Sequence, residues 1–309
     1  MLYQKKVSII IPVFNVQQHF LVEALDSAIN QTYHYLEIII VDDGSTDNSR
    51  KTCDDFSRKD NRVCVVHQSN KGLSAARNIG LDIMTGDAVV FLDADDALVP
   101  EYVERMLSAM ENSDADVVIC KYSIQSSFVN EQQVQRKTGP TIEPGVYDRV
   151  NALNGLVDAK INHSVWNKMY LSSLWENIRF PEGRVYEDVD TTYRILDMCK
   201  KTVVINDVLY LYRVHSGSIT DTCTKEKIED GLLAIEHFCS FIQKNTPDIF
   251  TNDQLKKCRQ IHLKGLIGNY VRLINSNCEG DVSFREELKK IRSFLAKCWR
   301  CTLERTALL

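Results

Sequence analysis

The 309-residue chain has no long hydrophobic run. No segment approaches the ~20 consecutive apolar residues of a membrane-spanning helix. The apolar run at residues 7–13 is too short for the core of a secretory signal, and no cleavage site follows it. We therefore expect the protein to stay in the cytoplasm, either free or peripheral on the inner membrane face.

An excess of positive charge is missing as well. The formal net charge is −5, whereas a broad nucleic-acid surface usually needs a basic domain, so we expect no nucleic-acid partner. With 44% hydrophobic and 26% charged residues, the composition is that of an ordinary globular protein with a sizeable core. The length fits one large α/β domain with a smaller appendage.

A second close pair of cysteines is also lacking. Among the ten cysteines, only Cys298 and Cys301 stand close together, so matching pairs of zinc ligands are not present. A zinc or redox role for this pair stays open beside the interpretation that we favour, two residues on one helix face. Most of the cysteines are expected to be small core residues of a cytoplasmic protein.

Short apolar segments alternate with helical patterns over the first 120 residues. The apolar segments are rich in Val and Ile and lack polar alternation, which indicates strands covered on both faces. Their order predicts an α/β fold with a mostly parallel sheet, flanked by helices, that binds ligands at the carboxyl ends of its strands. The predicted strands are 7–13, 37–41, 63–67 and 88–92, and the predicted helices are 22–31, 45–58 and 73–84.

The rest of the chain divides into three parts by pattern. Residues 124–162 are polar and irregular, and we predict a loop or hairpin there. Residues 164–220 are apolar again. From Lys225 onward the pattern is helical.

Three aspartates, Asp93, Asp95 and Asp96, follow the fourth predicted strand. Carboxylates so close together repel one another unless a cation neutralises them, and hard oxygen ligands suit Mg²⁺ or Mn²⁺. Mg²⁺ commonly takes one or two protein carboxylates and leaves its other positions to water and phosphate oxygens, which fits a nucleotide diphosphate. The alternative is a cap for the helix that Pro100 and Glu101 open, but this accounts for only one of the three acids.

Two further strand ends carry candidate nucleotide contacts. After the second strand, Asp42 or Asp43 could accept a hydrogen bond from a base or a ribose hydroxyl. After the third strand, Gly72 permits a tight entry into a helix whose amino end favours an anion, and Lys71 and Arg77 could meet a diphosphate. Solvated basic side chains at the start of a surface helix are the alternative for Lys71 and Arg77.

Four motifs in this part of the chain resemble those of the family 2 inverting glycosyltransferases with the GT-A fold. They are residues 8–15 (SIIIPVFN), 41–47 (VDDGSTD), 70–78 (NKGLSAARN) and 93–96 (DADD). Their order and spacing match the family over about residues 5–120, and a weaker resemblance covers 164–220. The chain looks most similar to bacterial members that build capsules, O-antigens, exopolysaccharides or glycoprotein glycans.

The resemblance implies both an activity and a domain division. The activity is transfer of a hexose or N-acetylhexosamine from a UDP-sugar to a hydroxyl of a growing glycan, lipid-linked or protein-linked, by single displacement with Mn²⁺ or Mg²⁺. The division is a GT-A domain at 1–222, with a nucleotide-sugar half at 1–120 and an acceptor half at 121–222, and a C-terminal helical region at 223–309.

The resemblance also implies roles for single residues. Asp43 would meet the uracil with Asp42 beside it, and Asp93 would contact the ribose or the metal shell. Asp95 would bind the metal directly. His215 could be a further metal contact, because some enzymes with this fold use a histidine near this point; the alternative is a histidine whose hydrogen bonds are simply satisfied where it lies. The residues implied to form the nucleotide-sugar site are Pro12, Val13, Asn15, Asp42, Asp43, Asn70, Lys71, Gly72, Arg77, Asp93 and Ala94.

Glu187 and Asp188 resemble the acidic catalytic motif of the same family. The resemblance implies that Asp188 is the general base, because an acceptor hydroxyl is a poor nucleophile until its proton is taken. Both acids also precede a helical pattern at 189–199, and acids are common at helix starts. We assign Trp166 and Lys168 to the acceptor site, since sugars stack on aromatic faces. A donor contact or a core position remains the alternative for Trp166.

The C-terminal residues 284–303 have the pattern of a basic amphipathic helix. Such a helix could lie on an anionic membrane and present a lipid-linked acceptor, or it could pack against the domain or a partner subunit, which we favour. The oligomeric state is open, and a homo-oligomer is one alternative.

Two other functions are considered. A sugar-nucleotide pyrophosphorylase would need a glycine-rich phosphate loop after the first strand, where the chain instead has Pro12 to Asn15 without glycine. A non-catalytic scaffold that binds nucleotide sugars would not need Asp95 and Asp188.

Overall fold

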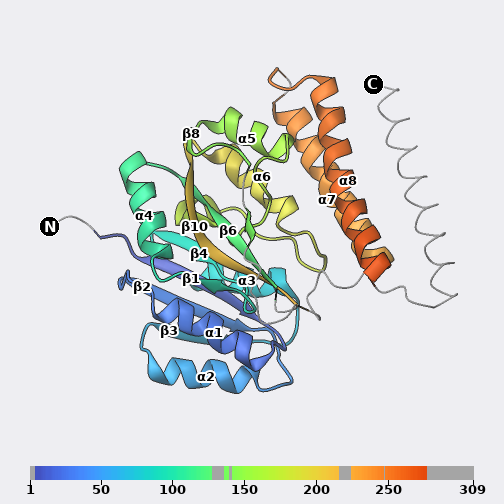
Figure 1. Cartoon of the computed structure of the whole chain (residues 1–309). Coiled ribbons are helices and arrows are strands. Elements are labelled where there is room, and N and C mark those ends of the chain that lie inside the picture. The colour runs from blue at the N-terminus through green and yellow to red at the C-terminus, as the bar shows by residue number, and fades with distance from the viewer. Residues whose placement is uncertain (1–3, 127–135, 139–140, 216–223, 247, 277–309) are drawn as a thin grey trace, which may run out of the picture. The chain divides into compact units, whose positions relative to one another are not determined.

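The structure is a computed structural model that describes residues 4–126, 136–138, 141–215, 224–246 and 248–276 (Figure 1). The chain forms two compact units, Met1–His215 and Ser216–Leu309. The domain boundary predicted at 222/223 falls within 216–223, outside the described residues.

The first unit is built on one mixed sheet with strand order β3-β2-β1-β4-β9-β6-β10-β5. Strands β1 to β4 are parallel neighbours, and β9 joins them to the second half by antiparallel pairing with both β4 and β6. The strands are β1 (Val7–Val13), β2 (Leu36–Asp42), β3 (Val63–His67), β4 (Ala88–Phe91), β5 (Ala97–Leu98), β6 (Val117–Ser126), β7 (Arg136–Thr138), β8 (Gly145–Tyr147), β9 (Lys168–Leu171) and β10 (Thr202–Val214). The four strands predicted from the sequence are confirmed, as is the α/β class.

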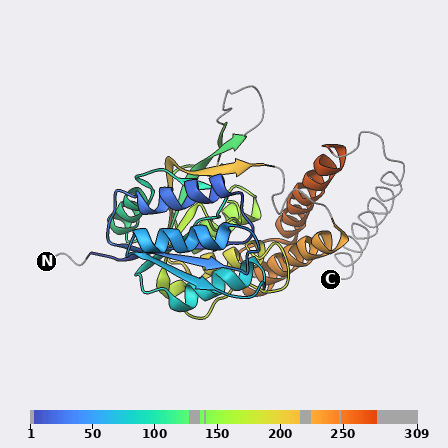
Figure 2. The ribbon, with the colours of Figure 1, turned by 90° about the horizontal axis from the view of Figure 1, so that it is seen from below.

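Helices cover both faces of the parallel part, which is why β1 is buried along its whole length. The helices of this unit are α1 (Gln18–Ile29), α2 (Ser49–Lys59), α3 (Leu73–Ile83), α4 (Tyr102–Ser113), α5 (Arg149–Val157) and α6 (Val189–Met198), with the 3₁₀ turn η1 (Ser172–Trp175). Figure 2 shows α1 and α2 side by side over one face of the sheet.

Alternation along β1 sends neighbouring side chains to opposite faces. Ile9 and Ile11 share an apolar cluster with Leu21 of α1. Ile10 points the other way, where Gly80 of α3 lies so close that an added Cβ would stand 2.4 Å from the Ile10 side chain. Glycine at position 80 therefore lets α3 pack directly on the sheet.

The second half of the unit confirms one prediction in part. Residues 124–162 were expected to form a loop or hairpin, and β6 and β7 do pair antiparallel there, but β8 and α5 were not predicted. The polar sequence conceals α5, which starts where the Asp148 side chain accepts from Asn151 N and buries Ala152, Leu153 and Leu156.

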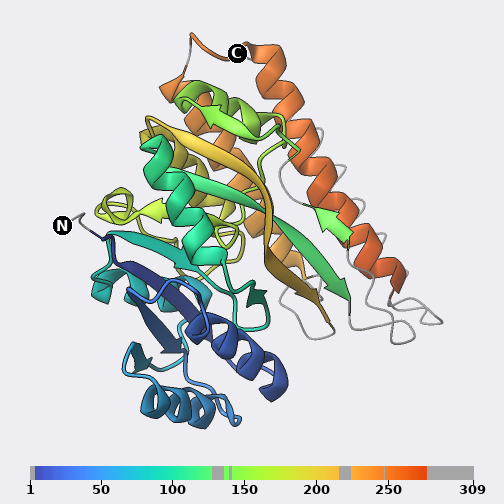
Figure 3. The same ribbon diagram turned by 60° about the vertical axis from the view of Figure 1, so that its left-hand side comes forward.

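The sheet also joins the two predicted halves of the domain. Strand β6 runs through the expected division at 120/121 and pairs with β10 along most of its length, as Figure 3 shows. The nucleotide-sugar half and the acceptor half are therefore parts of one continuous sheet.

The second unit contains α7 (Lys225–Asn245) and α8 (Asn252–Ser276), which pack against each other. They confirm the predicted helical pattern as far as Ser276. The basic helix predicted at 284–303, with Cys298 and Cys301, lies outside the described residues. None of the described helices combines the length and apolar character needed to cross a membrane. Among the cysteines in the described parts of the chain, all but Cys64 are buried.

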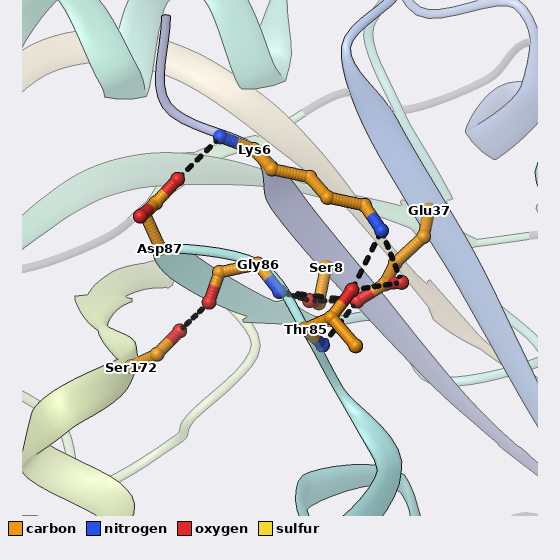
Figure 4. A network of polar contacts seen from close by, with 7 residues as sticks. All are labelled: Lys6, Ser8, Glu37, Thr85, Gly86, Asp87 and Ser172. Atoms are coloured by element: carbon orange, nitrogen blue, oxygen red, sulfur yellow. Dashed lines mark hydrogen bonds and ion pairs between the residues drawn. The ribbon is translucent and has the colours of Figure 1, made fainter. Parts of the chain in front are cut away.

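A polar network joins the amino ends of β1 and β2 to the turn before β4 (Figure 4). The Glu37 carboxylate is its centre: it accepts from Lys6 Nζ at 2.6 Å, from Ser8 Oγ at 2.6 Å and from the backbone N–H groups of Thr85 and Gly86. Burial alone would raise the pKa of Glu37, but these donors outweigh it and hold the pKa below its ordinary value. The network therefore stabilises the ionised carboxylate.

Replacing Glu37 by Gln should lower the free energy of unfolding by about 2 kcal/mol, because the amide turns a donor toward groups that themselves donate. Because the folded pKa of Glu37 lies below the ordinary 4.5, this stabilisation is complete above that pH and is lost as pH falls through the folded pKa. Urea unfolding at pH 7 and pH 3.5 measures both effects. Glu176→Gln, at an exposed site, is the control; equal losses in the two variants would contradict the prediction.

Candidate active site

The loops that follow β1 and β2 are tied together at the carboxyl edge of the sheet. Asn15 Oδ1 accepts from Thr46 N at 2.8 Å, and Asn15 N donates to Ser45 Oγ at 3.1 Å. Asn15 adopts a left-handed backbone with φ of 48°, a conformation that non-glycine residues rarely take away from turns and functional sites. Pro12 and Val13, which precede it in β1, are buried.

The loop that follows β3 is held by Asp43. Its Oδ1 accepts from Lys71 N at 2.8 Å and its Oδ2 accepts from Gly72 N at 2.8 Å. Gly72 has φ of 94°, so glycine is suited to this turn into α3. The structure thus brings together the predicted nucleotide residues of the 41–47 and 70–78 motifs, and Asp43 itself is nearly buried in this contact.

Asp42 is completely buried beside Asp43. Its Oδ1 accepts from Ser45 N at 3.0 Å, and its Oδ2 lies 2.8 Å from His67 Nδ1. Burial would raise the pKa of Asp42, but the hydrogen bonds from Ser45 and His67 hold it below the ordinary value. Both carboxylate oxygens of Asp42 therefore have partners within the protein, as do those of Asp43.

Phe14 is a residue of this edge that the sequence analysis did not single out. It stands between buried Val13 and Asn15, yet its side chain is 46% exposed. An exposed aromatic side chain directly after a buried strand offers a flat apolar face at the site. The sequence signal, a Phe immediately beyond the last strand residue, was present.

Arg77 joins the two acidic motifs. Its NH2 lies 2.8 Å from Asp93 Oδ1 and its NH1 lies 2.5 Å from Glu187 Oε1, although Glu187 is 110 residues away in the chain. The side chain is 2% exposed, and its guanidinium lies over the Phe180 ring. Burial would lower the pKa of Arg77, but the two carboxylates raise it above its ordinary value. The diphosphate contact predicted for Arg77 stays a prediction: the two ion pairs involve NH1 and NH2, and the buried Nε has no hydrogen-bond partner within the described part of the chain.

The three aspartates after β4 have different surroundings. Asp96 is buried and accepts from Tyr210 OH and from Arg213 N, each at 2.7 Å, so it anchors β10 to this loop. Asp95 Oδ2 lies 2.9 Å from His215 Nε2. Burial and the neighbouring Asp93 carboxylate raise the pKa of Asp95 above its ordinary value, and they outweigh the hydrogen bond with His215, which lowers it.

These surroundings fit a divalent cation held jointly with a diphosphate. Within the described residues, no group of three or more His, Cys, Asp or Glu side chains is arranged to enclose a metal. The protein offers the carboxylates of Asp93 and Asp95, with His215 beside Asp95. One or two carboxylate ligands are what Mg²⁺ takes when phosphate oxygens and water complete its shell, and a cation here would relieve the repulsion at Asp95.

Glu187 and Asp188 lie at the start of α6, as their pattern predicted. Asp188 Oδ1 accepts from Val189 N at 2.7 Å and so caps the helix, and Tyr186 before them has a left-handed φ of 62°. Burial, followed by the Glu187 carboxylate, raises the pKa of Asp188 to about 6. At neutral pH Asp188 is therefore mostly ionised, yet basic enough to take a proton.

Of the two predicted acceptor residues, only Trp166 is partly exposed. Its ring stacks on those of Tyr210 and Tyr212, with centroids 4.4 Å and 5.4 Å away. Lys168 is fully buried: its Nζ donates to Ser164 O, Asn167 Oδ1 and two oxygens of Asn162. This burial argues against the acceptor contact predicted for Lys168 and makes it a support for the segment that carries Trp166.

The chain is similar to known glycosyltransferases in sequence. The model of the family described as glycosyl transferase family 2 matches residues 8–180. Glycosyltransferase GlyG of Streptococcus pneumoniae is 37% identical over 70% of this chain and 73% of its own length. Putative glycosyltransferase EpsH of Bacillus subtilis is 32% identical over 77% and 70%. Glycosyltransferase GlyA of S. pneumoniae is 36% identical over 73% of this chain, which spans only 33% of that relative.

Solved structures share the fold at low sequence identity. Staphylococcus aureus TarS 1-349 in complex with UDP-GlcNAc has a TM-score of 0.62 at 19% identity, over 84% of this chain and 81% of that one. The mannosyltransferase PcManGT of Pyrobaculum calidifontis, in complex with GDP-Man and Mn²⁺, has a TM-score of 0.54 at 16% identity, over 99% and 85%. The GT-A fold implied by the sequence motifs is thereby confirmed.

Replacing Arg77 by Met should lower the free energy of unfolding by about 3 kcal/mol, because it leaves the Glu187 charge buried without a partner. Adding Glu187→Gln to that variant should recover part of the loss, since the unpaired charge is then removed. Arg58→Met, which breaks an exposed ion pair with Asp55, is the control and should cost less than about 1 kcal/mol. Urea unfolding measures all three. If Arg77→Met lost no more unfolding free energy than the control, the stabilising role of the Arg77 ion pairs with Asp93 and Glu187 would be refuted.

Proposed function

The chain belongs to glycosyl transferase family 2, and from this premise we propose that it transfers one sugar from a UDP-sugar to an acceptor hydroxyl on a growing glycan. The sugar is a hexose or an N-acetylhexosamine, and the acceptor glycan is lipid-linked or protein-linked. The UDP-GlcNAc bound to TarS and the relatives with names in glycan assembly, such as minor teichoic acid biosynthesis protein GgaB of B. subtilis, support this choice.

The contact of Arg77 with both Asp93 and Glu187 carries the proposal. Asp93 is two residues from Asp95, the proposed metal ligand, and Glu187 adjoins Asp188, the proposed base. One buried guanidinium therefore holds the cation-binding acids and the proton-accepting acid at the same edge of the sheet. Sugar transfer needs these two acidic groups on either side of one reacting carbon.

The reaction we propose is a single displacement that inverts the anomeric configuration. The acceptor oxygen forms a bond to the anomeric carbon while the bond from that carbon to the diphosphate oxygen breaks, and Asp188 accepts the hydroxyl proton. Glu187, paired with Arg77, holds its charge beside Asp188 and so contributes to the basicity of that group. UDP leaves with the bonding electrons.

A divalent cation, Mg²⁺ or Mn²⁺, would be held by Asp95 and Asp93 with His215 beside them. Such an ion supplies electrostatic stabilisation of the negative charge that gathers on the departing diphosphate. The Mn²⁺ bound to PcManGT supports this assignment.

The nucleotide lies in this proposal along the loops after β1, β2 and β3. The exposed Phe14 ring provides a face for the uracil. The buried Asp43, which accepts from Lys71 N, lies at the same carboxyl edge of the sheet. Lys71 is exposed at the start of α3, where it can meet a phosphate. Pro12, Asn15, Asn70, Gly72 and Ala94 complete this lining.

The acceptor lies on the side of Trp166, which presents an aromatic surface supported by Tyr210 and Tyr212. We place the reaction in the cytoplasm, at or near the inner membrane face if the acceptor is lipid-linked. Membership of the family sets aside the pyrophosphorylase alternative. The non-catalytic scaffold is separated from the enzyme by experiment.

Asp188→Asn should reduce the rate of UDP release from the donor by about 10²- to 10⁴-fold while UDP affinity changes less than twofold, since the amide cannot accept the proton. In the wild type, kcat/KM should fall as pH drops below about 6, where Asp188 becomes protonated. Stopped assays over pH 5–8 and calorimetric UDP titration measure these effects, with Asp55→Asn at an exposed site as the control. If Asp188→Asn turned over the donor at the wild-type rate, Asp188 could not be the catalytic base.

The donor is identified by incubating the purified protein with a panel of nucleotide sugars and measuring the nucleotide released. We expect a UDP-hexose or UDP-N-acetylhexosamine to be turned over only when Mg²⁺ or Mn²⁺ is present. Turnover that continues in the presence of a chelator would exclude the metal role of Asp95, and the family assignment would be unaffected.

A further inference from the structure

His67, the last residue of β3, lies between two carboxylates and is not used in the proposed reaction. Its Nδ1 is 2.8 Å from Asp42 Oδ2 and its Nε2 is 3.0 Å from Asp54 Oδ1. Asp42 ends β2 and is completely buried, whereas the Asp54 side chain on α2 is 38% exposed. The ring therefore connects a strand end to the helix that covers the sheet.

The connection continues into the proposed nucleotide site. From His67 it passes through Asp42 Oδ2 and Oδ1 to the backbone N–H of Ser45, then from Ser45 Oγ to the N–H of Asn15. Asn15 Oδ1 in turn accepts a hydrogen bond from Thr46 N. A single chain of contacts thus runs from α2 to the left-handed residue at the end of β1.

The charge state of the ring decides how many of these contacts exist. Ionised carboxylates only accept hydrogen bonds, and a neutral imidazole carries one N–H, so it can donate to one of the two acids. The imidazolium form donates to both, and such charge-assisted bonds are stronger than neutral ones. The titratable groups that face His67 are Asp42 from β2 and Asp54 from α2, with the buried Cys53 thiol of α2 near both acids.

We propose that His67 is a positioning residue for UDP binding, which in its protonated form holds the Asp42–Ser45 turn and through it Asn15 in the conformation that receives the nucleotide. The affinity for UDP is then higher when His67 is charged than when it is neutral. This role rests on the proposed function in that UDP is taken as the ligand.

The test is calorimetric titration of UDP into the full chain at pH 5.5 and pH 8.5, the range in which histidine side chains change charge. His67→Asn places a neutral amide near the position of Nδ1, so it keeps a donor for Asp42 at every pH. We expect this variant to bind UDP about fivefold more weakly than wild type at pH 5.5 and within twofold at pH 8.5. Because wild type and variant are compared at the same pH, the ionisation of UDP affects both affinities equally and cancels in their ratio.

Two further variants distinguish positioning from folding. Asp54→Asn leaves Asp42 and His67 in place and removes the exposed acid, so it should lose part of the affinity at pH 5.5 and none at pH 8.5. His34→Asn makes the same substitution as the test variant at an exposed position before β2 and should match wild type at both pH values.

A ratio of wild-type to His67→Asn affinity that does not change with pH would overturn the role of His67, and so would an Asp54→Asn variant identical to wild type at pH 5.5. Absence of UDP binding by the wild type at both pH values would overturn the donor proposal together with this one. Equal binding by wild type and all variants would overturn only the inference about His67.

Discussion

The site depends on one buried cation, the guanidinium of Arg77. It is enclosed by α3, which carries it, and by two acids that come from distant parts of the chain. Burial of a charge costs free energy that an ion pair offsets, and each of these acids would in turn be poorly solvated without Arg77. The requirement for mutual neutralisation therefore links the loop after β4 to the start of α6. The acids proposed for metal binding and for proton transfer are positioned by the same interaction.

The parallel sheet makes this arrangement possible because it gathers the loops at one edge. Asn15, Asp43 and Asp93 each follow a different strand, yet all lie at the carboxyl edge and are linked there by hydrogen bonds or ion pairs. At the amino edge, the Glu37 carboxylate of β2 accepts hydrogen bonds from two other segments, the start of β1 and the turn before β4, and so ties them together. In this chain the carboxyl edge carries the proposed site, and buried polar contacts stabilise the sheet at both edges.

Much of this could be predicted from the sequence because the signals are local. Runs of Val and Ile predicted the parallel strands, and the acids directly after them predicted the edge that we propose as the ligand site. The helical pattern at 189–199 placed Asp188 at a helix start, where the structure shows it capping α6, and the family resemblance singled it out as a base.

Other features depend on partners that are far away in sequence. The sequence around Arg77 does not indicate that it pairs with Glu187. The sequence around Lys168 does not indicate that oxygens of residues 162–167 enclose its ammonium group. Both were interpreted as ligand contacts, because a basic residue in a motif resembles a binding group until its burial is known. His67 was overlooked since its two acids come from β2 and α2.

The most direct measurement of the central claim is a crystal structure of the protein with UDP and Mn²⁺. The account predicts one Mn²⁺ coordinated by Asp95 and by the diphosphate, with Arg77 still paired to Glu187 and the Asp188 carboxylate facing the same cleft. A nucleotide bound elsewhere, or a metal–diphosphate pair from which Asp188 is turned away, would contradict it.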